Sequence, residues 1–278
     1  MRVTVWGTRG SIATPGPQTA RYGGNTACVT VEGEGGTFVV LDAGTGVRLA
    51  GAAVPHSVKR IDLFLTHLHM DHIIGLGFFP PLQRPDLEVH IWGPKAAGGD
   101  LKTRLNRYLS PPLFPVRLRD VPAAVTLHEI AAAEVAIGEL KVTSSFVTHP
   151  DPALGFRVAS KRRAIAYLPD HEPALGAREF PAGPTWTSGH RIAAGADVLL
   201  HDSQYTASEY EERVGWGHSS IDQSVAFARQ AGVGELMLFH HDPSHDDATI
   251  AALAEDAAER AGSEVMTSAA AEGRVIEL

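Results

Sequence analysis

Residues 61–75 read Ile-Asp-Leu-Phe-Leu-Thr-His-Leu-His-Met-Asp-His-Ile-Ile-Gly, and they join an apolar run to a dense group of polar side chains. The run Ile61–Leu65 predicts a buried strand. Four polar side chains follow it closely: His67, His69, Asp71 and His72. Burying three imidazoles and a carboxylate costs free energy unless a partner satisfies them, and a divalent cation does so. Since zinc and manganese both accept these ligands, the stretch predicts a metal site where the strand ends.

The spacing within this motif sorts the four side chains into two pairs. His67 and His69 are two positions apart at the end of a strand, so they should point the same way and hold one ion. Asp71 and His72 follow at the turn into the next segment and should point elsewhere, which suits a second ion. The alternative is a surface loop that is merely rich in histidine, and the density of the His-x-His-x-Asp-His pattern disfavours it.

Composition describes an ordinary globular chain with an acidic balance. The chain has 278 residues, of which 44% are hydrophobic and 20% are charged, so we expect one domain spanning residues 1–278. The net charge of −8 disfavours an extended nucleic-acid-binding surface. Cys28 is the only cysteine, which excludes an internal disulfide and a cysteine-based zinc site. Fourteen histidines point instead to metal chemistry that uses imidazoles and carboxylates.

No segment of the sequence predicts export or membrane insertion. The N-terminus begins with the strand-like alternation Arg2–Trp6 and lacks a charged segment followed by an apolar one, so we expect no signal peptide. No stretch approaches the roughly 20 apolar residues of a membrane span. We therefore expect a cytoplasmic protein with no membrane partner.

Apolar runs and turn residues along the chain predict alternating strands and helices. Two helices are expected: residues 220–231, with Ser220 and Gln223 forming a capping box, and residues 247–261. Residues 100–124 mix arginine, tyrosine and proline and are interpreted as a long loop or flap. The expected strands are residues 3–6, 27–32, 37–41, 61–66, 88–92, 140–148, 154–159, 164–168, 198–201, 235–239 and 274–278.

Three further polar residues directly follow apolar strands and are candidate ligands. His149 follows Phe146-Val-Thr, and the next residue, a proline, favours extended backbone at this position. Asp170 ends the run 165–170, and a carboxylate can bridge two cations. His240 ends the run 236–240. Each of the three, taken singly, is also typical of a polar residue where a strand meets solvent.

The motif and the order of these residues resemble the metallo-β-lactamase superfamily. The resemblance implies an α/β fold, specifically the four-layer αββα sandwich. It also implies that Asp42, in Asp-x-Gly-x-Gly, orients a ligating histidine, although a plain turn aspartate is the alternative. His241 is ambiguous, but the register of Leu-x-x-His favours His240. By the resemblance, the first ion is held by His67, His69 and His149, and the second by Asp71, His72 and His240, with Asp170 bridging.

The chemistry that the resemblance implies is hydrolysis on two divalent ions, zinc or manganese. Two such ions can hold a bridging hydroxide and neutralise an oxyanion, so no serine or cysteine nucleophile is required. Asp71 and Asp170 would orient the hydroxide. Asp71 is thereby both a ligand and a catalytic residue. A general acid for the leaving oxygen is still useful.

Two short elements further along the chain supply candidates for that acid. Leu200-His-Asp-Ser203 and Gly217-His-Ser-Ser220 resemble elements of the RNase Z-like phosphodiesterases, with Asp202 where glutamate is usual. By this resemblance His218 contacts phosphate or protonates the leaving group, and Asp202 orients it. His218 also precedes an expected helix, whose N–H groups attract anions. The alternative is that His218 merely neighbours the helix cap and has no role.

The opening of the chain narrows the resemblance to one branch. Thr8-Arg-Gly-Ser11 and Arg21-Tyr-Gly-Gly-Asn-Thr26 resemble RNase Z-like, PhnP-like and cyclic-nucleotide-phosphodiesterase-like members. The chain lacks the long basic Gly/Pro-rich arm with which RNase Z grips tRNA. We therefore expect a hydrolase of a small phosphodiester or nucleotide, cyclic ones included.

Two alternatives for the function remain open. One is a lactone or thioester hydrolase on the same metal centre. The other is a non-catalytic module that senses nucleotides or metals. Dimers are common in this branch, so the resemblance also allows a homodimer whose partner chain completes the rim near residues 105–118. A contribution of His190 to the site is left open.

Overall fold

The central strands of the computed structural model are buried on both faces, and this explains their near-continuous apolar sequences. The structure describes residues 1–177 and 179–278. In strand β4 (Arg60–Phe64), Ile61 and Leu63 pack with helices, whereas Phe64 packs in the core between the two sheets. Strand β12 (Glu235–Phe239) shows the same alternation, with Leu236 facing helices and Met237 facing the other sheet. Alternate residues of one strand therefore serve two cores, as expected for sheets covered on both sides.

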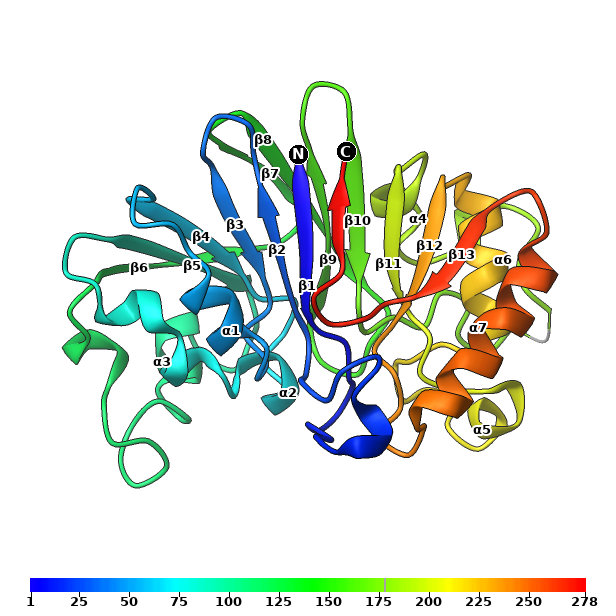
Figure 1. Ribbon diagram of the computed structural model, residues 1–278, viewed down its shortest axis with the longest axis horizontal. Helices are drawn as coiled ribbons and strands as arrows, with labels where there is room; N and C mark the ends of the chain where they lie inside the picture. The colour runs from blue at the N-terminus through cyan, green and yellow to red at the C-terminus, as the bar shows by residue number, and fades with distance from the viewer. Residues whose placement is uncertain (178) are drawn as a thin grey trace.

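Two seven-stranded sheets form the inner layers (Figure 1). Each sheet has an antiparallel part followed by four neighbouring parallel strands, β3 to β6 in one sheet and β10 to β13 in the other. The first sheet has the order β14 (Val275–Glu277), β1 (Arg2–Gly7), β2 (Cys28–Glu32), β3 (Phe38–Leu41), β4, β5 (Glu88–Pro94) and β6 (Ala124–Ile130). The second has the order β13 (Met266–Ala269), β12, β11 (Val198–Asp202), β10 (Ala164–Leu168), β9 (Ala153–Ala159), β8 (Leu140–Val147) and β7 (Ala133–Ile137).

Helices cover the outer faces and complete the four layers (Figure 1). The first sheet packs against α1 (Val47–Ala52), α2 (Met70–Ile73) and α3 (Leu101–Leu105). The second packs against α4 (His190–Ala193), α6 (Ile221–Ala231) and α7 (Asp247–Ala261), and α5 (Ala207–Glu211) lies in a connection. Single-turn 3₁₀ helices span Pro17–Thr19, Leu76–Phe78, Pro80–Gln83, Leu118–Asp120 and Pro184–Trp186. The αββα sandwich expected from the sequence is confirmed.

The parallel strands bring functional loops to one edge of the sandwich. The loops after β3, β4, β10, β11 and β12 all leave the carboxyl ends of parallel strands, where ligands bind in open α/β sheets. This edge carries α2 and lies at the bottom of Figure 1. The termini lie together at the opposite edge, where the amino group of Met1 donates to the carbonyl of Leu278 at 2.8 Å.

Local structure differs from the sequence expectations in several places, and strands β6, β7 and β13 were not expected. Residues 100–124 are not one loop, because α3 and the 3₁₀ turn Leu118–Asp120 bury Leu101, Leu105 and Leu118 under the first sheet. Strand β4 ends at Phe64, two residues earlier than expected, so the histidine motif lies in the following loop and in α2. The expected capping box of Ser220 and Gln223 is present at the start of α6.

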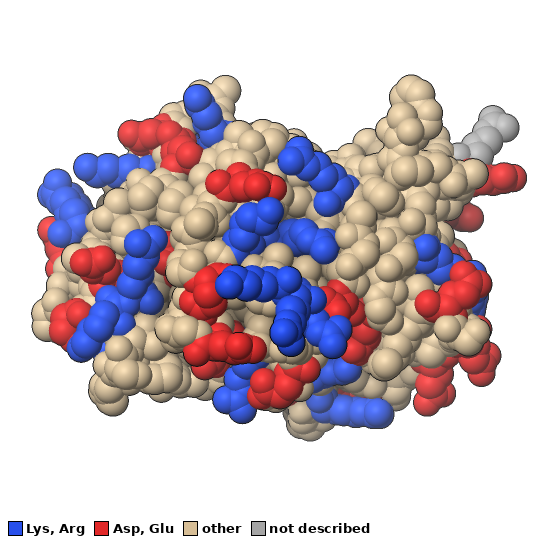
Figure 2. Space-filling view, turned by 90° about the horizontal axis from the view of Figure 1, so that it is seen from above, with Lys and Arg blue, Asp and Glu red and all other residues tan. Residues whose placement is uncertain are grey.

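The edge that carries the termini shows mixed charge. Lysine and arginine side chains alternate there with aspartate and glutamate, without one continuous basic surface (Figure 2). No helix among the described residues has the length and hydrophobicity needed to cross a bilayer.

Candidate metal centre

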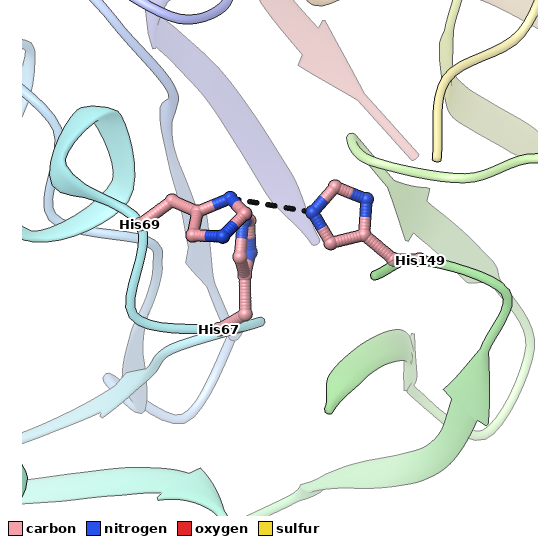
Figure 3. Close-up of side chains that lie close together, drawn as sticks. All are labelled: His67, His69 and His149. Carbon is pink, nitrogen blue, oxygen red and sulfur yellow. Dashed lines mark hydrogen bonds between the residues drawn. The ribbon is translucent and has the colours of Figure 1, made fainter. Parts of the chain in front are cut away.

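Three histidines from two distant segments form the first group. His67 and His69 lie in the loop after β4, and His149 follows β8 on the other sheet. One ring nitrogen from each lies within 4.8 Å of the others, and the three could hold a metal ion. Nδ1 of His69 and Nε2 of His149 face each other at 3.3 Å (Figure 3). The structure thus brings together the three histidines that the sequence resemblance assigned to one ion.

The ring nitrogens turned away from this group have hydrogen-bonding partners. Nε2 of His69 lies 3.0 Å from a carboxylate oxygen of Asp151, and Nδ1 of His149 lies 3.1 Å from the carbonyl of Gly217. Because both partners accept, the outward nitrogens carry the protons. The inward nitrogens therefore have lone pairs available for a cation. In metal sites, a hydrogen bond from the other ring nitrogen commonly fixes a ligating histidine in this way.

A second group of ligand atoms lies beside the first. Nε2 of His72 is 2.9 Å from Asp170 and 3.3 Å from Asp71. Nε2 of His240 is 3.2 Å from Asp71 and 3.4 Å from Asp170. All four side chains are buried and could hold a metal ion, which matches the grouping expected from the sequence. His240 adopts a left-handed backbone conformation, with φ 60°, at the end of β12.

Asp170 lies between the two groups. Its Oδ1 is 3.7 Å from Nε2 of His67, while its Oδ2 faces His72 and His240 in the second group. Three buried polar atoms here have no partner with hydrogen-bond geometry among the described residues: Nε2 of His67, Nε2 of His72 and Oδ2 of Asp170. Unpaired buried polar atoms are costly, so three that converge on one space fit a site that a cation completes.

The electrostatics of the cluster keep the carboxylates ionised and act in opposite directions on the buried histidines His67 and His72. Burial, together with the neighbouring imidazole of His72, lowers the pKa of His67 well below its usual value. Burial opposes ionisation of Asp170, but the imidazoles of His240 and His72 outweigh it and lower its pKa. The same balance lowers the pKa of Asp71. Burial opposes protonation of His72 as well, but Asp170 and Asp71 outweigh it and raise the pKa of His72 well above its usual value, so a cation that binds here would displace a proton from His72.

Asp42 fixes the ring of His72 in the second group. It is fully buried after β3, and its Oδ2 lies 2.8 Å from Nδ1 of His72. The backbone N–H of Thr66 and the hydroxyl of Tyr167 also donate to this carboxylate. The contact leaves Nε2 of His72 free to face the cluster, which is the arrangement that the sequence resemblance implied for Asp42.

Changing Asp42→Asn should weaken zinc binding by about 10–100-fold, because the hydrogen bond that fixes the His72 ring loses its charged acceptor. Competition with a chromogenic chelator measures this affinity. Asp62→Asn is the matched control, since Asp62 is a buried carboxylate of the same sheet that bonds Arg60 and Trp92 instead. Wild-type zinc affinity in Asp42→Asn would show that this contact does not orient a ligand.

A histidine–aspartate pair stands next to the two groups. Nδ1 of His218 lies 2.7 Å from Oδ2 of Asp202, and the His218 ring stacks on His240 at 5.0 Å. Burial opposes protonation of His218, but Asp202 outweighs it and raises the pKa of His218 to about 9. Asp202 also accepts backbone N–H groups of His171 and Ser219, so its position is fixed. His218 precedes the Ser220 cap of α6 by two residues and is not in the helix itself.

The family to which the chain belongs follows from comparison with known proteins. The model of the family described as "Beta-lactamase superfamily domain" matches residues 37–241, from β3 through the last of the clustered histidines. The chain belongs to this superfamily. By that membership and the clustered ligands, it is a metal-dependent hydrolase of the metallo-β-lactamase fold.

Individual relatives agree with this family. Ribonuclease Z of Haloarcula marismortui is 28% identical over 280 residues, covering 86% of each chain. The metallo-β-lactamase fold protein YhfI of Bacillus subtilis superposes with a TM-score of 0.70 and 18% identity over 99% of both chains. A diphosphatase of the PhnP family superposes with a TM-score of 0.68 and 19% identity, covering 100% of this chain and 97% of its own. At these identities the two structures show the shared fold.

Two histidines that the sequence left open lie outside the metallo-β-lactamase cluster. The buried side chain of His241 turns away from His240, and its Nε2 lies 3.0 Å from the carbonyl of Ala270. His190 begins α4, and its Nε2 lies 3.4 Å from the carbonyl of Gln230. The geometry therefore favours His240 over His241, as the Leu-x-x-His register did.

Several residues that support the cluster were missed by the sequence reasoning. Gln204 accepts from Nδ1 of His240 at 3.0 Å, and the backbone N–H of Ser11 donates to Asp71 at 2.8 Å. Asp151, which pairs with His69, was also missed. The buried carboxylate of Glu172 accepts the N–H groups of Gly215 and Gly217 and the hydroxyl of Tyr210, and so holds the loop before His218. Apart from Ser11, which belongs to the motif Thr8-Arg-Gly-Ser11, these residues carry no signal in the sequence, because each contact crosses between distant loops.

Gly217 is a position where the fold of the site requires glycine. Its φ is +87°, and an added Cβ would lie 2.2 Å from Nδ1 of His149. Gly217→Ala should displace His149 and lower zinc occupancy of the first group. Gly232→Ala is the matched control, since Gly232 has φ +61° with open space around it and should cost only the backbone strain of about 1–2 kcal/mol. Thermal unfolding and elemental analysis of both variants test this, and equal zinc contents would contradict it.

Proposed function

We propose that the chain is a dinuclear phosphodiesterase that acts on a small phosphodiester or nucleotide, cyclic nucleotides included. The observation that carries this proposal is the 2.7 Å pair of His218 and Asp202, which stands against His240 beside two groups of ligand atoms. A phosphodiester has a leaving oxygen that needs a proton, and a positioned imidazole can supply one.

The residues proposed to hold the ions are those of the two groups of ligand atoms described above. The first ion would be held by His67, His69 and His149, and the second by Asp71, His72 and His240, with Asp170 shared between them. Zinc or manganese suits these nitrogen and oxygen ligands. Such ions supply Lewis acidity and lower the pKa of the hydrolytic water.

The side chains around the cluster have separate tasks in this proposal. Asp71 and Asp170 orient the hydrolytic water, because an oxygen of each lies within 3.4 Å of Nε2 of both His72 and His240. His218 binds a phosphate oxygen or gives a proton to the leaving oxygen. Asp202 accepts from Nδ1 of His218, so the other ring nitrogen of His218 is the one available to the substrate.

Cleavage of RNA is a second candidate, because curated relatives of similar length bear the names Ribonuclease Z and Ribonuclease BN. RNA also presents phosphodiesters, so the same side chains would serve. The net charge of −8 favours the small substrate, since binding of long nucleic acids relies on cationic surface.

A substrate panel distinguishes the candidates. The zinc- or manganese-loaded protein is assayed with bis-4-nitrophenyl phosphate, cyclic nucleotides, a homoserine lactone, a thioester and a structured pre-tRNA. The proposal predicts turnover of the first two. Hydrolysis of the lactone or thioester alone would overturn it, as would cleavage of pre-tRNA without cleavage of small diesters. Failure of every substrate would favour a non-catalytic sensing module.

A further inference from the structure

A largely apolar cavity of about 700 Å³ opens beside the first histidine group. Its walls come from four segments: the start of α2, the turn after β5, the segment from α3 to Leu113, and Asp151–Pro152 after β8. A volume between about 300 and 1,000 Å³ with mostly apolar walls is typical of a small-molecule site. The apolar walls include Leu68, Met70, Ala96, Tyr108 and Leu113.

The cavity adjoins the metal centre directly. His69 lines the cavity and also belongs to the first histidine group. Asp151, which holds the outward nitrogen of His69 at 3.0 Å, lines it as well. The cavity and the metal centre therefore share His69 as a common wall. A substrate whose phosphate lies at the clustered ligands can place its organic part in this cavity.

The walls combine exposed apolar surface with the guanidinium of Arg107. Met70 is 48% exposed and Leu113 is 69% exposed, so both offer apolar surface that a ligand in the cavity could cover. Arg107 is exposed, bonds the carbonyl of Gly98 at 3.4 Å and forms no ion pair with any described residue, whereas Arg104 pairs with Glu129. Tyr108 is anchored through its hydroxyl to the carbonyl of Ile74, so its ring is a fixed part of the wall.

We propose that this cavity binds an aromatic ring on one ester arm of the substrate, seated on Met70 and Leu113 and faced by the guanidinium of Arg107. Flat rings bury apolar area and also interact favourably with a guanidinium over their face. The inference rests on the proposed function for the identity of the reacting group, a phosphodiester. It adds the substrate class: diesters with an aromatic arm, such as a nucleobase or an aryl group, over diesters with small aliphatic arms.

The test measures binding of two non-hydrolysable probes that differ only in the ring. Phenylphosphonate and methylphosphonate are titrated into the zinc-loaded protein by calorimetry. Phenylphosphonate should bind at least about 10-fold more tightly, because burial of the ring stabilises its complex. Ala96→Trp, which fills the cavity, should bring the two dissociation constants to within about 2-fold.

Two further variants test whether a lost phenyl preference in Ala96→Trp comes from misfolding. Leu113 is largely exposed, so Leu113→Ala should leave the fold intact and lower the phenyl preference by about 3-fold. Ala252→Trp places the same indole on the exposed surface of α7 and should keep the wild-type preference.

The outcomes separate this inference from the proposed function. Equal affinities of the two probes for the wild type, or an unchanged preference in Ala96→Trp, would overturn the inference even if phosphodiesters are hydrolysed. A phenyl preference that disappears in Ala96→Trp would support it even if the substrate panel showed that the reacting group is not a phosphodiester.

Discussion

Replacing His67 with alanine is expected to lower the zinc content from two ions per chain to one and to reduce phosphodiester hydrolysis by about 10³-fold. The side chain is fully buried, and its unpaired Nε2 faces the space between the two groups of ligand atoms. Without it, the first ion would keep His69, His149 and the carboxylate of Asp170, which it shares with the second ion, and this smaller set of ligands holds zinc weakly. Loss of Lewis-acid assistance worth several kcal/mol corresponds to this fall in rate.

Elemental analysis of the purified variant measures the loss, and His241→Ala serves as its control. His241 is also buried and lies beside a proposed ligand, but its Nε2 bonds the carbonyl of Ala270. His241→Ala should therefore keep both ions. Full zinc occupancy in His67→Ala would refute its role as a ligand, and loss of an ion in His241→Ala would reopen the choice between His240 and His241.

Replacing His218 with alanine should have the opposite combination of effects: zinc is retained and the rate is lost. His218 bonds Asp202 and belongs to neither of the two main groups of ligand atoms. Removal of a general acid costs about 10²–10⁴-fold in rate. The expected result is a fall in kcat of that size for a cyclic nucleotide, whose sugar oxygen leaves poorly without a proton, with the zinc content unchanged.

A matched histidine and a double variant sharpen this test. His190→Ala removes a histidine of α4 that lies outside the cluster and should leave kcat unchanged. Asp202→Asn combined with His218→Ala should be no slower than His218→Ala alone, because two residues that act as a unit are not additive. An unchanged kcat in His218→Ala would mean that this side chain only neighbours the cap of α6.

The proposed ligands could be predicted from the sequence because the signal is local. His67, His69, Asp71 and His72 lie within six consecutive positions after an apolar run, and burying so many polar groups together is costly without a partner. Asp170 and His240 each end a buried parallel strand, and the carboxyl ends of such strands meet at one edge of the fold. Periodicity and the resemblance together therefore predicted both the layers and the grouping of the ligands.

The residues that hold these ligands in position could not be predicted in the same way. Gln204, Asp151 and Glu172 act through contacts between loops that are far apart in the chain, and an isolated polar residue in a loop is ordinary. Strands β6 and β7 were missed because their outward faces are partly exposed and their apolar alternation is weak. Helix α3 was missed because the segment 100–124 is rich in proline and arginine. This short helix is stabilised by the packing of its two leucines and has no strong local sequence pattern.

The shared position of Asp170 is the feature on which the two-ion proposal depends. Its Oδ1 faces His67, and its Oδ2 faces His72 and His240, so one carboxylate reaches both groups. A centre that used one ion would leave the buried carboxylate or one histidine group unpaired.

Titration of metal-free protein with zinc, while hydrolysis of bis-4-nitrophenyl phosphate is followed, tests the central claim most directly. The protein is first stripped with a chelator, and activity is recorded after each addition of zinc. We predict that activity rises until two equivalents per chain are bound and then stays constant. A plateau at one equivalent, or full activity before any zinc is added, would contradict the dinuclear mechanism.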